Sequence, residues 1–251
     1  MKITTLGTSH GNATYCRFNS STLYENEKGD MYLFDCGAPV DALLVRAKKD
    51  ITRLKAVFNT HVHADHIGGL PVLIKAYLKF YKQGKLFVAC AEGGVIQPVK
   101  AFYSAMHGQK SEDTDSFIEF SEVTQGCVYE DESITVSAVA TKHMDYCGGK
   151  SFAYVLTEKD SGKTLLYTGD LDAHFSDFPS HIEADVCICE ATHYKQEDAA
   201  EILPHCKFKS FVFNHVHDPW HGEEGERKLL AYCRDLPYPV RIAHDLEEFE
   251  F

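Results

Sequence analysis

The segment Lys55-Ala-Val-Phe-Asn-Thr60 followed by His61-Val-His63-Ala-Asp65-His66 carries most of what this chain reveals about its fold. Its first half has the apolar character of a strand, and its second half packs three imidazoles and a carboxylate into six residues. In an extended segment, His61 and His63 point to the same side, so they can share one metal ion. The chain then turns into a helix and brings Asp65 and His66 toward a neighbouring position. This density of ligand types predicts a metal site at the end of a sheet strand.

Short β-rich runs alternate with helical stretches along the whole chain. In the first half, strands are predicted near residues 2–6, 21–25, 31–35, 55–60 and 85–90, and helices near 39–49, 68–82 and 94–107. In the second half, strands are predicted near 116–123, 133–140, 151–157, 163–168, 185–189 and 209–214, helices near 195–203 and 223–234, and a last pair of strands over 239–243 and 247–251. This pattern predicts an α/β fold in which two mixed β-sheets pack face to face between helices, an αββα sandwich. Periodicity alone leaves other α/β layouts open.

Composition sets the broad class of protein. With 251 residues, of which 44% are hydrophobic, the chain is long enough to bury a large core, and we expect residues 1–251 to form one domain. No run approaches the roughly 18 to 20 apolar residues that cross a bilayer, and the first residues resemble a strand rather than a signal peptide. Nine cysteines without a Cys-x-x-Cys pair are typical of a reducing compartment. We therefore expect a cytoplasmic protein that does not contact membranes.

The formal net charge of -12 bears on the partners of this chain. An acidic surface repels polyanions and offers no basic stripe to a nucleic-acid backbone, which weighs against long RNA or DNA as the substrate. A small anionic substrate is still compatible, because two divalent cations in a cleft dominate the local field. The sequence leaves the oligomeric state open, a homodimer included.

The segment His61-Val-His63-Ala-Asp65-His66 resembles the His-x-His-x-Asp-His signature of the metallo-β-lactamase superfamily. Other elements match in order: Met1–Thr8 and Tyr32-Leu-Phe-Asp-Cys-Gly37 resemble the opening strands, and Tyr167-Thr-Gly-Asp170, Cys189-Glu-Ala-Thr192 and Phe211-Val-Phe-Asn-His215 resemble later motifs. The later motifs are most similar to the branch that contains ribonuclease Z and small phosphodiesterases. The resemblance covers nearly the whole chain and implies the metallo-β-lactamase fold.

The resemblance also implies a set of metal ligands. Two adjacent ions would be held by His61, His63, Asp65, His66, His143, Asp170 and His215. Asp170 would bridge the ions, and Asp65 and Asp170 would be the catalytic residues. His215 is preferred to His217 because it directly follows the apolar strand near 209–214. Nitrogen and oxygen ligands favour Zn²⁺ first, with Mn²⁺ or Fe²⁺ as alternatives.

These ligands predict a dinuclear metal-dependent hydrolase. Two metals roughly 3.5 to 4 Å apart lower the pKa of a bridging water to near neutrality, and the resulting hydroxide would attack a small phosphodiester such as a cyclic nucleotide. Ribonuclease Z relatives insert a long tRNA-gripping arm before the bridging aspartate, whereas here only Met144 to Gly169 intervene. The alternatives are a ribonuclease Z-like RNA endonuclease, a thioester or lactone hydrolase on the same fold, and a non-enzymatic metal-binding sensor module.

The remaining candidates would assist the metal site or contact the substrate. Ribonuclease Z relatives pair the histidine of a His-Ser-Thr motif with the glutamate of the Glu-Ala-Thr segment as general acid; here Glu190 is present without that motif. His193 or His205 could replace the missing histidine, although a surface position is the plainer interpretation of each. His217 and His221 are candidates for contacting the metal ligands or the substrate, and a surface position is at least as plain an interpretation of each. Asp35 is expected to hydrogen-bond a ligand histidine and fix its tautomer, or else to form an ordinary turn.

Overall fold

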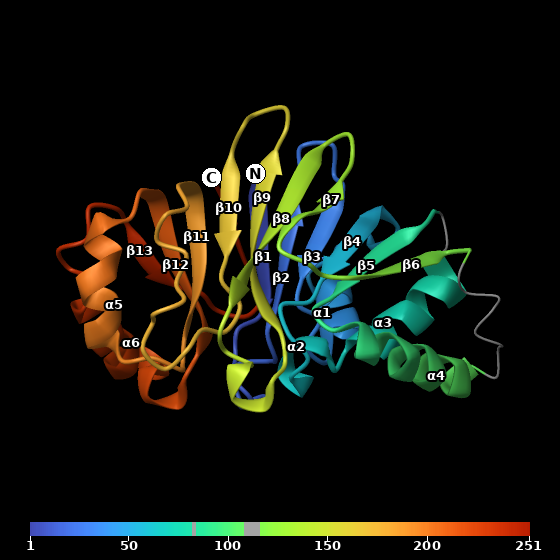
Figure 1. The fold of residues 1–251 in the computed structure, drawn as a ribbon, viewed down its shortest axis with the longest axis horizontal. Helices are drawn as coiled ribbons and strands as arrows, with labels where there is room; N and C mark the ends of the chain where they lie inside the picture. The colour runs from blue at the N-terminus through green and yellow to red at the C-terminus, as the bar shows by residue number, and fades with distance from the viewer. Residues whose placement is uncertain (82–83, 108–115) are drawn as a thin grey trace. The chain divides into compact units, whose positions relative to one another are not determined.

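The computed structural model describes residues 1–81, 84–107 and 116–251 (Figure 1). The end of the helix predicted near 68–82 and the polar stretch 108–115 lie partly or wholly outside the described residues. The described chain divides into two compact units: unit 1 comprises Met1–Val123 with Asp245–Glu250, and unit 2 comprises Thr124–His244 with Phe251. Each unit contains one seven-stranded sheet. The single domain expected for residues 1–251 stays a prediction.

Unit 1 is built on a mixed sheet with the strand order β14-β1-β2-β3-β4-β5-β6. The first four strands in this order pair antiparallel, and the strands from β3 to β6 pair parallel. Parallel neighbours need crossover connections, which the helices supply. The strands are β1 (Lys2–Gly7), β2 (Ser21–Glu25), β3 (Met31–Phe34), β4 (Leu54–Phe58), β5 (Leu86–Cys90), β6 (Ile118–Glu122) and β14 (Glu247–Glu250); the helices are α1 (Val40–Arg46), α2 (Ala64–Ile67), α3 (Leu70–Ala76) and α4 (Ile96–His107).

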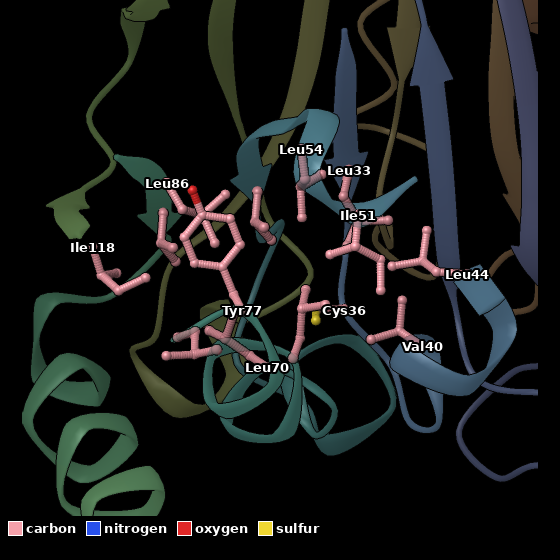
Figure 2. Close-up of a cluster of buried hydrophobic side chains, with 14 of the residues drawn as sticks. Leu33, Cys36, Val40, Leu44, Ile51, Leu54, Leu70, Tyr77, Leu86 and Ile118 are labelled. Atoms are coloured by element: carbon pink, nitrogen blue, oxygen red, sulfur yellow. The ribbon is translucent and has the colours of Figure 1, made fainter. Parts of the chain in front are cut away.

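The core of unit 1 forms between the helices and the sheet, as Figure 2 shows for side chains from β3, α1, α3 and β5. The apolar residues of the predicted helix 68–82 are buried in it, among them Leu70, Leu73 and Ile74. The helix itself differs from the prediction, because α3 ends at Ala76 and the chain continues as a π-helical turn over Tyr77–Tyr81. Tyr77 and Leu78 are still buried in this wider turn. The predicted apolar face of the segment is therefore correct, although its backbone hydrogen bonds are those of a π-helix.

Unit 2 repeats the plan with the strand order β13-β12-β11-β10-β9-β8-β7. Strands β7 to β10 pair antiparallel and β10 to β13 pair parallel. Its core joins the strands to α5 and α6. The elements are β7 (Gly126–Glu130), β8 (Ile134–Thr141), β9 (Ser151–Glu158), β10 (Thr164–Tyr167), β11 (Ala184–Ala191), α5 (Gln196–Ile202), β12 (Phe208–Val216), α6 (Gly222–Ala231) and β13 (Val240–Ile242).

Two sequence expectations need correction. Strand β7 was not predicted, because its residues at the sheet edge are exposed or half-buried and lack an alternating pattern. The last two predicted strands exist, but they do not pair with each other: β13 pairs with β12 in unit 2, and β14 pairs with β1 in unit 1. The two mixed sheets with their helices confirm the predicted α/β class. None of the described helices is long and apolar enough to cross a membrane.

The parallel part of each sheet ends at the predicted ligands. In unit 1, Asp35 follows β3 and His61 follows β4; in unit 2, Asp170 follows β10 and Glu190 lies near the end of β11. The carboxyl ends of parallel strands meet at the same edge of a sheet and are a common location for binding sites in α/β folds. Each unit therefore presents its candidate residues at one edge.

Candidate metal centre

The histidine loop, residues 61–66, holds four of the seven predicted ligands in unit 1. His61 and His63 precede α2, whereas Asp65 and His66 lie within it. The Nε2 atom of His61 lies 2.9 Å from Nδ1 of His63, and Nε2 of His66 lies 3.3 Å from Oδ2 of Asp65. The ring centroids of His61 and His66 are 4.1 Å apart. The structure thus brings these four side chains together, three of them buried and His63 half-buried.

Asp35 and Thr60 orient the rings of the histidine loop. One carboxylate oxygen of Asp35 lies 2.8 Å from Nδ1 of His66, and the other accepts the Thr60 backbone N–H at 2.8 Å. The Thr60 hydroxyl lies 3.0 Å from Nδ1 of His61. Because both Nδ1 atoms have oxygen partners, both rings offer Nε2 for another contact, the arrangement typical of ligand histidines. The sequence alone was compatible with two roles for Asp35, a hydrogen bond to a ligand histidine or an ordinary turn.

Backbone geometry holds Asp35 in this position. Asp35 has φ 58, a left-handed conformation that is uncommon for residues other than glycine and that concentrates at functional sites. The following turn touches the histidine loop, since the Cys36 N–H donates to the His66 carbonyl at 2.6 Å. A Cβ atom at Gly37 would lie 2.2 Å from the carbonyl oxygen of Asp65. Only glycine allows this approach between turn and loop.

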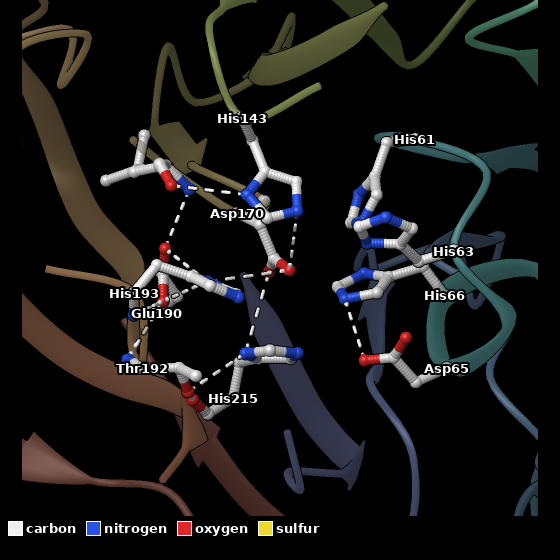
Figure 3. A network of polar contacts seen from close by, with 12 residues as sticks. His61, His63, Asp65, His66, His143, Asp170, Glu190, Thr192, His193 and His215 are labelled. Atoms are coloured by element: carbon white, nitrogen blue, oxygen red, sulfur yellow. Dashed lines mark hydrogen bonds and ion pairs between the residues drawn. The ribbon is translucent and has the colours of Figure 1, made fainter. Parts of the chain in front are cut away.

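In unit 2, the Asp170 cluster comprises Asp170, Glu190 and three histidines, His143, His193 and His215. The Asp170 carboxylate lies 3.7 Å from His143 Nε2, 3.7 Å from His193 Nδ1 and 3.6 Å from His215 Nδ1. Figure 3 shows the three imidazoles arranged around this carboxylate. One ligand atom from each of Asp170, Glu190, His193 and His215 lies within 4.8 Å of the others, a group of nitrogen and oxygen donors that could hold a metal ion.

A β-bulge places His215 in the Asp170 cluster. Along the β11–β12 pair, Glu190 faces Asn214 and Ala191 faces Val216, so His215 is an extra residue in β12. Its φ is 47, again left-handed. Bulges near active sites redirect a side chain out of the regular alternation. Thr192 holds the redirected residue, because its hydroxyl donates to the His215 carbonyl and lies 3.1 Å from His215 Nδ1.

The two histidines beyond the bulge occupy different surroundings. His217 is half-buried and precedes the short 3₁₀ helix Asp218–Trp220. His221 donates from Nε2 to the Val216 carbonyl at 2.8 Å, so it ties the loop back to the end of β12. His215 is in contact with the Asp170 cluster, because its Nδ1 atom lies 3.6 Å from the Asp170 carboxylate. This geometry supports the preference for His215 over His217 as the ligand of this segment.

Glu190 organises the segment that follows β11. Its carboxylate accepts the backbone N–H groups of Leu171 at 2.7 Å, Thr192 at 2.9 Å and His193 at 2.9 Å. It also lies 2.9 and 3.0 Å from Nδ1 of His193. Glu190 is buried, whereas the His193 side chain is 30% exposed. His193 is therefore fixed by Glu190 with its Nε2 atom pointing away from the carboxylate.

His193 and His205, equal candidates in the sequence, are separated by the structure. His205 ends the short 3₁₀ helix Leu203–His205 and is exposed. The spacing Glu190-x-x-His193 directly after a buried strand is the local signal that distinguishes His193, since a carboxylate there can bind the N–H groups two and three residues on. Thr192, which sequence analysis did not single out, acts through its hydroxyl contact with His215.

The stretch Met144–Gly169 contains a short 3₁₀ helix, Asp145–Cys147, and the hairpin of β9 and β10. The paired residues run from Thr164 opposite Thr157 to Tyr167 opposite Tyr154. The stretch therefore consists of this helix, the two strands and the turns that join them.

A family model described as "Anti-Pycsar protein Apyc1" matches residues 1–218. Among curated relatives, ribonuclease Z of Listeria welshimeri is 22% identical over 100% of this chain and 99% of its own length. Ribonuclease Z of Listeria monocytogenes serovar 1/2a is 28% identical with the same coverage, and that of Gloeothece citriformis is 32% identical over 64% of this chain and 48% of its own length. The two Listeria alignments span 313 positions, so those proteins contain stretches that the 251 residues here lack.

Solved structures with the same fold cover almost the whole chain. The metallo-β-lactamase fold protein YhfI from Bacillus subtilis has a TM-score of 0.77 at 19% identity, covering 99% of both chains. The short form of human tRNase Z has a TM-score of 0.76 at 21% identity, covering 100% of this chain and 99% of its own. A diphosphatase from the PhnP family has a TM-score of 0.72 at 18% identity, covering 100% and 97%. These similarities confirm the predicted fold.

Proposed function

The chain belongs to the anti-Pycsar protein Apyc1 family, and from this membership and the geometry of its two units we propose that it is a metal-dependent phosphodiesterase acting on a small phosphodiester. The predicted superfamily, in its ribonuclease Z and phosphodiesterase branch, is confirmed by the ribonuclease Z relatives and the metallo-β-lactamase-fold neighbours. Ribonuclease Z, the short human tRNase Z and the PhnP-family diphosphatase are hydrolases by name. We propose in addition the substrate class, the metal and the role of each residue.

The observation that carries the proposal is the Asp170 cluster, in which the Asp170 carboxylate lies 3.7 Å from His143 Nε2 and 3.6 Å from His215 Nδ1, a combination of donors that suits a divalent cation. The donors are imidazole nitrogens and carboxylate oxygens, which favour Zn²⁺, with Mn²⁺ or Fe²⁺ as alternatives. We assign the ligands of two ions to His61, His63, Asp65 and His66 of unit 1 and to His143, Asp170 and His215 of unit 2. When bound, the ions supply an activated water near neutral pH and positive charge for the phosphate oxygens.

We assign different roles to the side chains of the Asp170 cluster and their neighbours. His143 donates from Nδ1 to the Leu171 carbonyl at 3.3 Å, so its Nε2 faces Asp170 as a ligand nitrogen. His193 uses Nδ1 toward Glu190, which leaves Nε2 to deliver a proton to the leaving alkoxide. Thr192 fixes the orientation of His215 through its hydroxyl. Asp65 and Asp170 are the proposed catalytic carboxylates and orient the attacking water.

A small phosphodiester fits this chain better than a long nucleic acid. The net charge of -12 opposes a polyanion, and the segment Met144–Gly169 is a short turn and hairpin. A ribonuclease Z-like RNA endonuclease is the second candidate, because the short human tRNase Z matches the whole chain with a TM-score of 0.76. The cytoplasmic location and a homodimeric state stay predictions.

The proposal is tested by metal analysis and a turnover screen of protein expressed with added Zn²⁺ or Mn²⁺. The substrates are bis-p-nitrophenyl phosphate, cyclic nucleotides, a precursor tRNA, a thioester and a lactone, with Asp170→Ala as the matched variant. We expect bound transition metal, diester cleavage by the wild type, and loss of both in Asp170→Ala. Thioester cleavage without diester cleavage would contradict the substrate class. Equal activity of wild type and variant would contradict the site.

A further inference from the structure

A cavity of about 380 Å³ in unit 2 adjoins the Asp170 cluster. Its volume falls in the range of small-ligand pockets, roughly 300 to 1,000 Å³. Two of its lining residues, His143 and His193, belong to the Asp170 cluster. The cavity is also lined by Lys142, Tyr146, Leu171, Asp172 and Ala173. A molecule that reaches the two histidines therefore has room for a further group in this cavity.

Tyr146 gives the cavity an aromatic surface. It lies in the 3₁₀ helix Asp145–Cys147, and 74% of its surface is exposed. A single exposed aromatic residue is ordinary on a protein surface. Tyr146 differs because it lines a cavity together with two candidate site histidines, the buried residue Leu171 and the exposed residue Ala173. A tyrosine ring in such a position can stack on a planar ring of a ligand.

The walls of the cavity are held in place before any ligand binds. The Asp177 carboxylate accepts the Lys142 N–H at 2.6 Å with one oxygen and the Asp172 N–H at 3.0 Å with the other, so it joins the two lining segments. The turn that carries Tyr146 closes through the N–H groups of Cys147 and Gly149, which donate to the Met144 carbonyl at 3.2 and 3.1 Å. A preformed wall binds a ring without a large ordering cost.

We propose that this cavity is a nucleobase subsite and that Tyr146 is a specificity residue that stacks on the base. The inference rests on the proposed function, because the phosphodiester of the same substrate would lie at the metal centre, beside the two histidines that line the cavity. The substrate is then a small nucleotide phosphodiester whose planar base lies against Tyr146, beside Ala173. Lys142 and Asp172 supply polar groups for the heteroatoms of the base or sugar.

The test compares Tyr146→Ala with Tyr146→Phe, which keeps the ring, and with Tyr232→Ala. Tyr232 is a matched control, because it is an exposed tyrosine of the same unit that bonds Glu197 and is not among the lining residues. The substrates are a 3′,5′-cyclic nucleotide and the methyl riboside 3′,5′-cyclic phosphate, which lacks the base. We expect Tyr146→Ala to raise KM for the cyclic nucleotide by roughly 5- to 100-fold with kcat nearly unchanged. KM for the baseless substrate should stay within about twofold of wild type, as should both control variants on both substrates.

A binding measurement separates this inference from the proposed function. Calorimetric titration with a nucleoside 5′-monophosphate and with ribose 5-phosphate measures the contribution of the base without turnover. We expect the wild type and Tyr146→Phe to prefer the nucleotide, and Tyr146→Ala to lose that preference while its unfolding temperature is unchanged. If no diester is cleaved but the preference follows Tyr146, the proposed function fails and the subsite stands. If diesters are cleaved but Tyr146→Ala affects both ligands equally, or neither, the subsite is wrong.

Discussion

The Nδ1 atom of His193 lies 2.9 Å from Oε2 and 3.0 Å from Oε1 of Glu190, so one buried carboxylate fixes the orientation of one half-exposed imidazole. The same carboxylate accepts the backbone N–H groups of Thr192 and His193. A histidine held in this way by a buried partner presents its other ring nitrogen in a fixed direction. This relationship supports the proposed role of His193 as the proton donor, and it leads to the first prediction.

Replacement of His193 by alanine should slow the cleavage of diesters with a basic leaving group more than the cleavage of diesters with an acidic leaving group. A general acid contributes roughly 10²- to 10⁴-fold when the leaving group is a basic alkoxide and little when it is an acidic phenol. We therefore expect His193→Ala to lose most of its kcat on a cyclic nucleotide and to keep kcat within about tenfold of wild type on bis-p-nitrophenyl phosphate. His205→Ala is the control and should leave both rates unchanged. Equal losses on both substrates in His193→Ala would instead indicate a metal ligand.

The second prediction concerns His215 and its neighbour His217. Asparagine tolerates left-handed backbone, so His215→Asn removes the imidazole without adding strain at the bulge. We expect this variant to bind about one metal ion fewer per chain, measured by elemental analysis, and to lose diesterase activity. His217→Asn should keep its metal content. A full metal complement in His215→Asn would assign the ligand elsewhere.

The third prediction concerns the Asp35 contact with His66. Asp35→Asn also tolerates the left-handed φ, but its NH₂ group must face either the Thr60 N–H or His66 Nδ1. We expect metal affinity to fall by roughly 10- to 100-fold, as for other residues that orient ligand histidines. The unfolding free energy should fall by about 1–3 kcal/mol because a buried donor loses its partner.

Competition with a chelator measures the affinity of Asp35→Asn, and denaturation in excess chelator measures its stability without metal. Asp41→Asn, on α1 of the same unit, serves as the charge-matched control. The assigned role of Asp35 would be refuted by a variant that loses stability while its metal affinity equals that of the control.

Local sequence features predicted much of this molecule. The histidine loop was visible because its four candidate ligands lie within six residues, and most strands were visible as apolar runs that the two cores bury. Strand β7 was not visible, since an exposed edge strand needs no alternation. The partners of β13 and β14 are set by pairings far along the chain, which periodicity does not contain.

In the candidate site too, features set by neighbouring residues were predictable and contacts between residues far apart in the chain were not. The position of His215 after an apolar run was predictable, but the bulge that redirects it depends on the register between β11 and β12. The contact of Asp35 with His66 joins residues 31 positions apart, and the sequence left it undecided. Tyr146 carried no signal, because what distinguishes it is the cavity that it lines.

The last prediction concerns Asp177, which joins the two walls of the cavity. Burial raises the pKa of the Asp177 carboxyl above its usual value of 3.8, and the charge of Asp172 adds to this rise. The folded protein therefore holds the Asp177 proton more tightly than the unfolded chain does. It follows that the contribution of Asp177 to the free energy of unfolding should decrease as the pH rises from about 4 through the raised pKa, and then level off.

The pKa of Asp172 is shifted in the opposite direction, below its usual value. Burial raises the pKa of Asp172, but hydrogen bonds from Ser176 and His174 outweigh burial and leave that pKa below 3.8, so its contribution is lost only in more acidic solution. Burial also raises the pKa of Asp245, so the comparison of wild type with Asp177→Asn in urea denaturation from about pH 4 to pH 7 is what isolates Asp177. In Asp177→Asn the decrease over this range should be smaller than in wild type. At neutral pH the variant should be less stable by about 1–3 kcal/mol, because its amide can accept from only one of the N–H groups of Lys142 and Asp172. The same slope in both proteins would show that Asp177 does not titrate in this range.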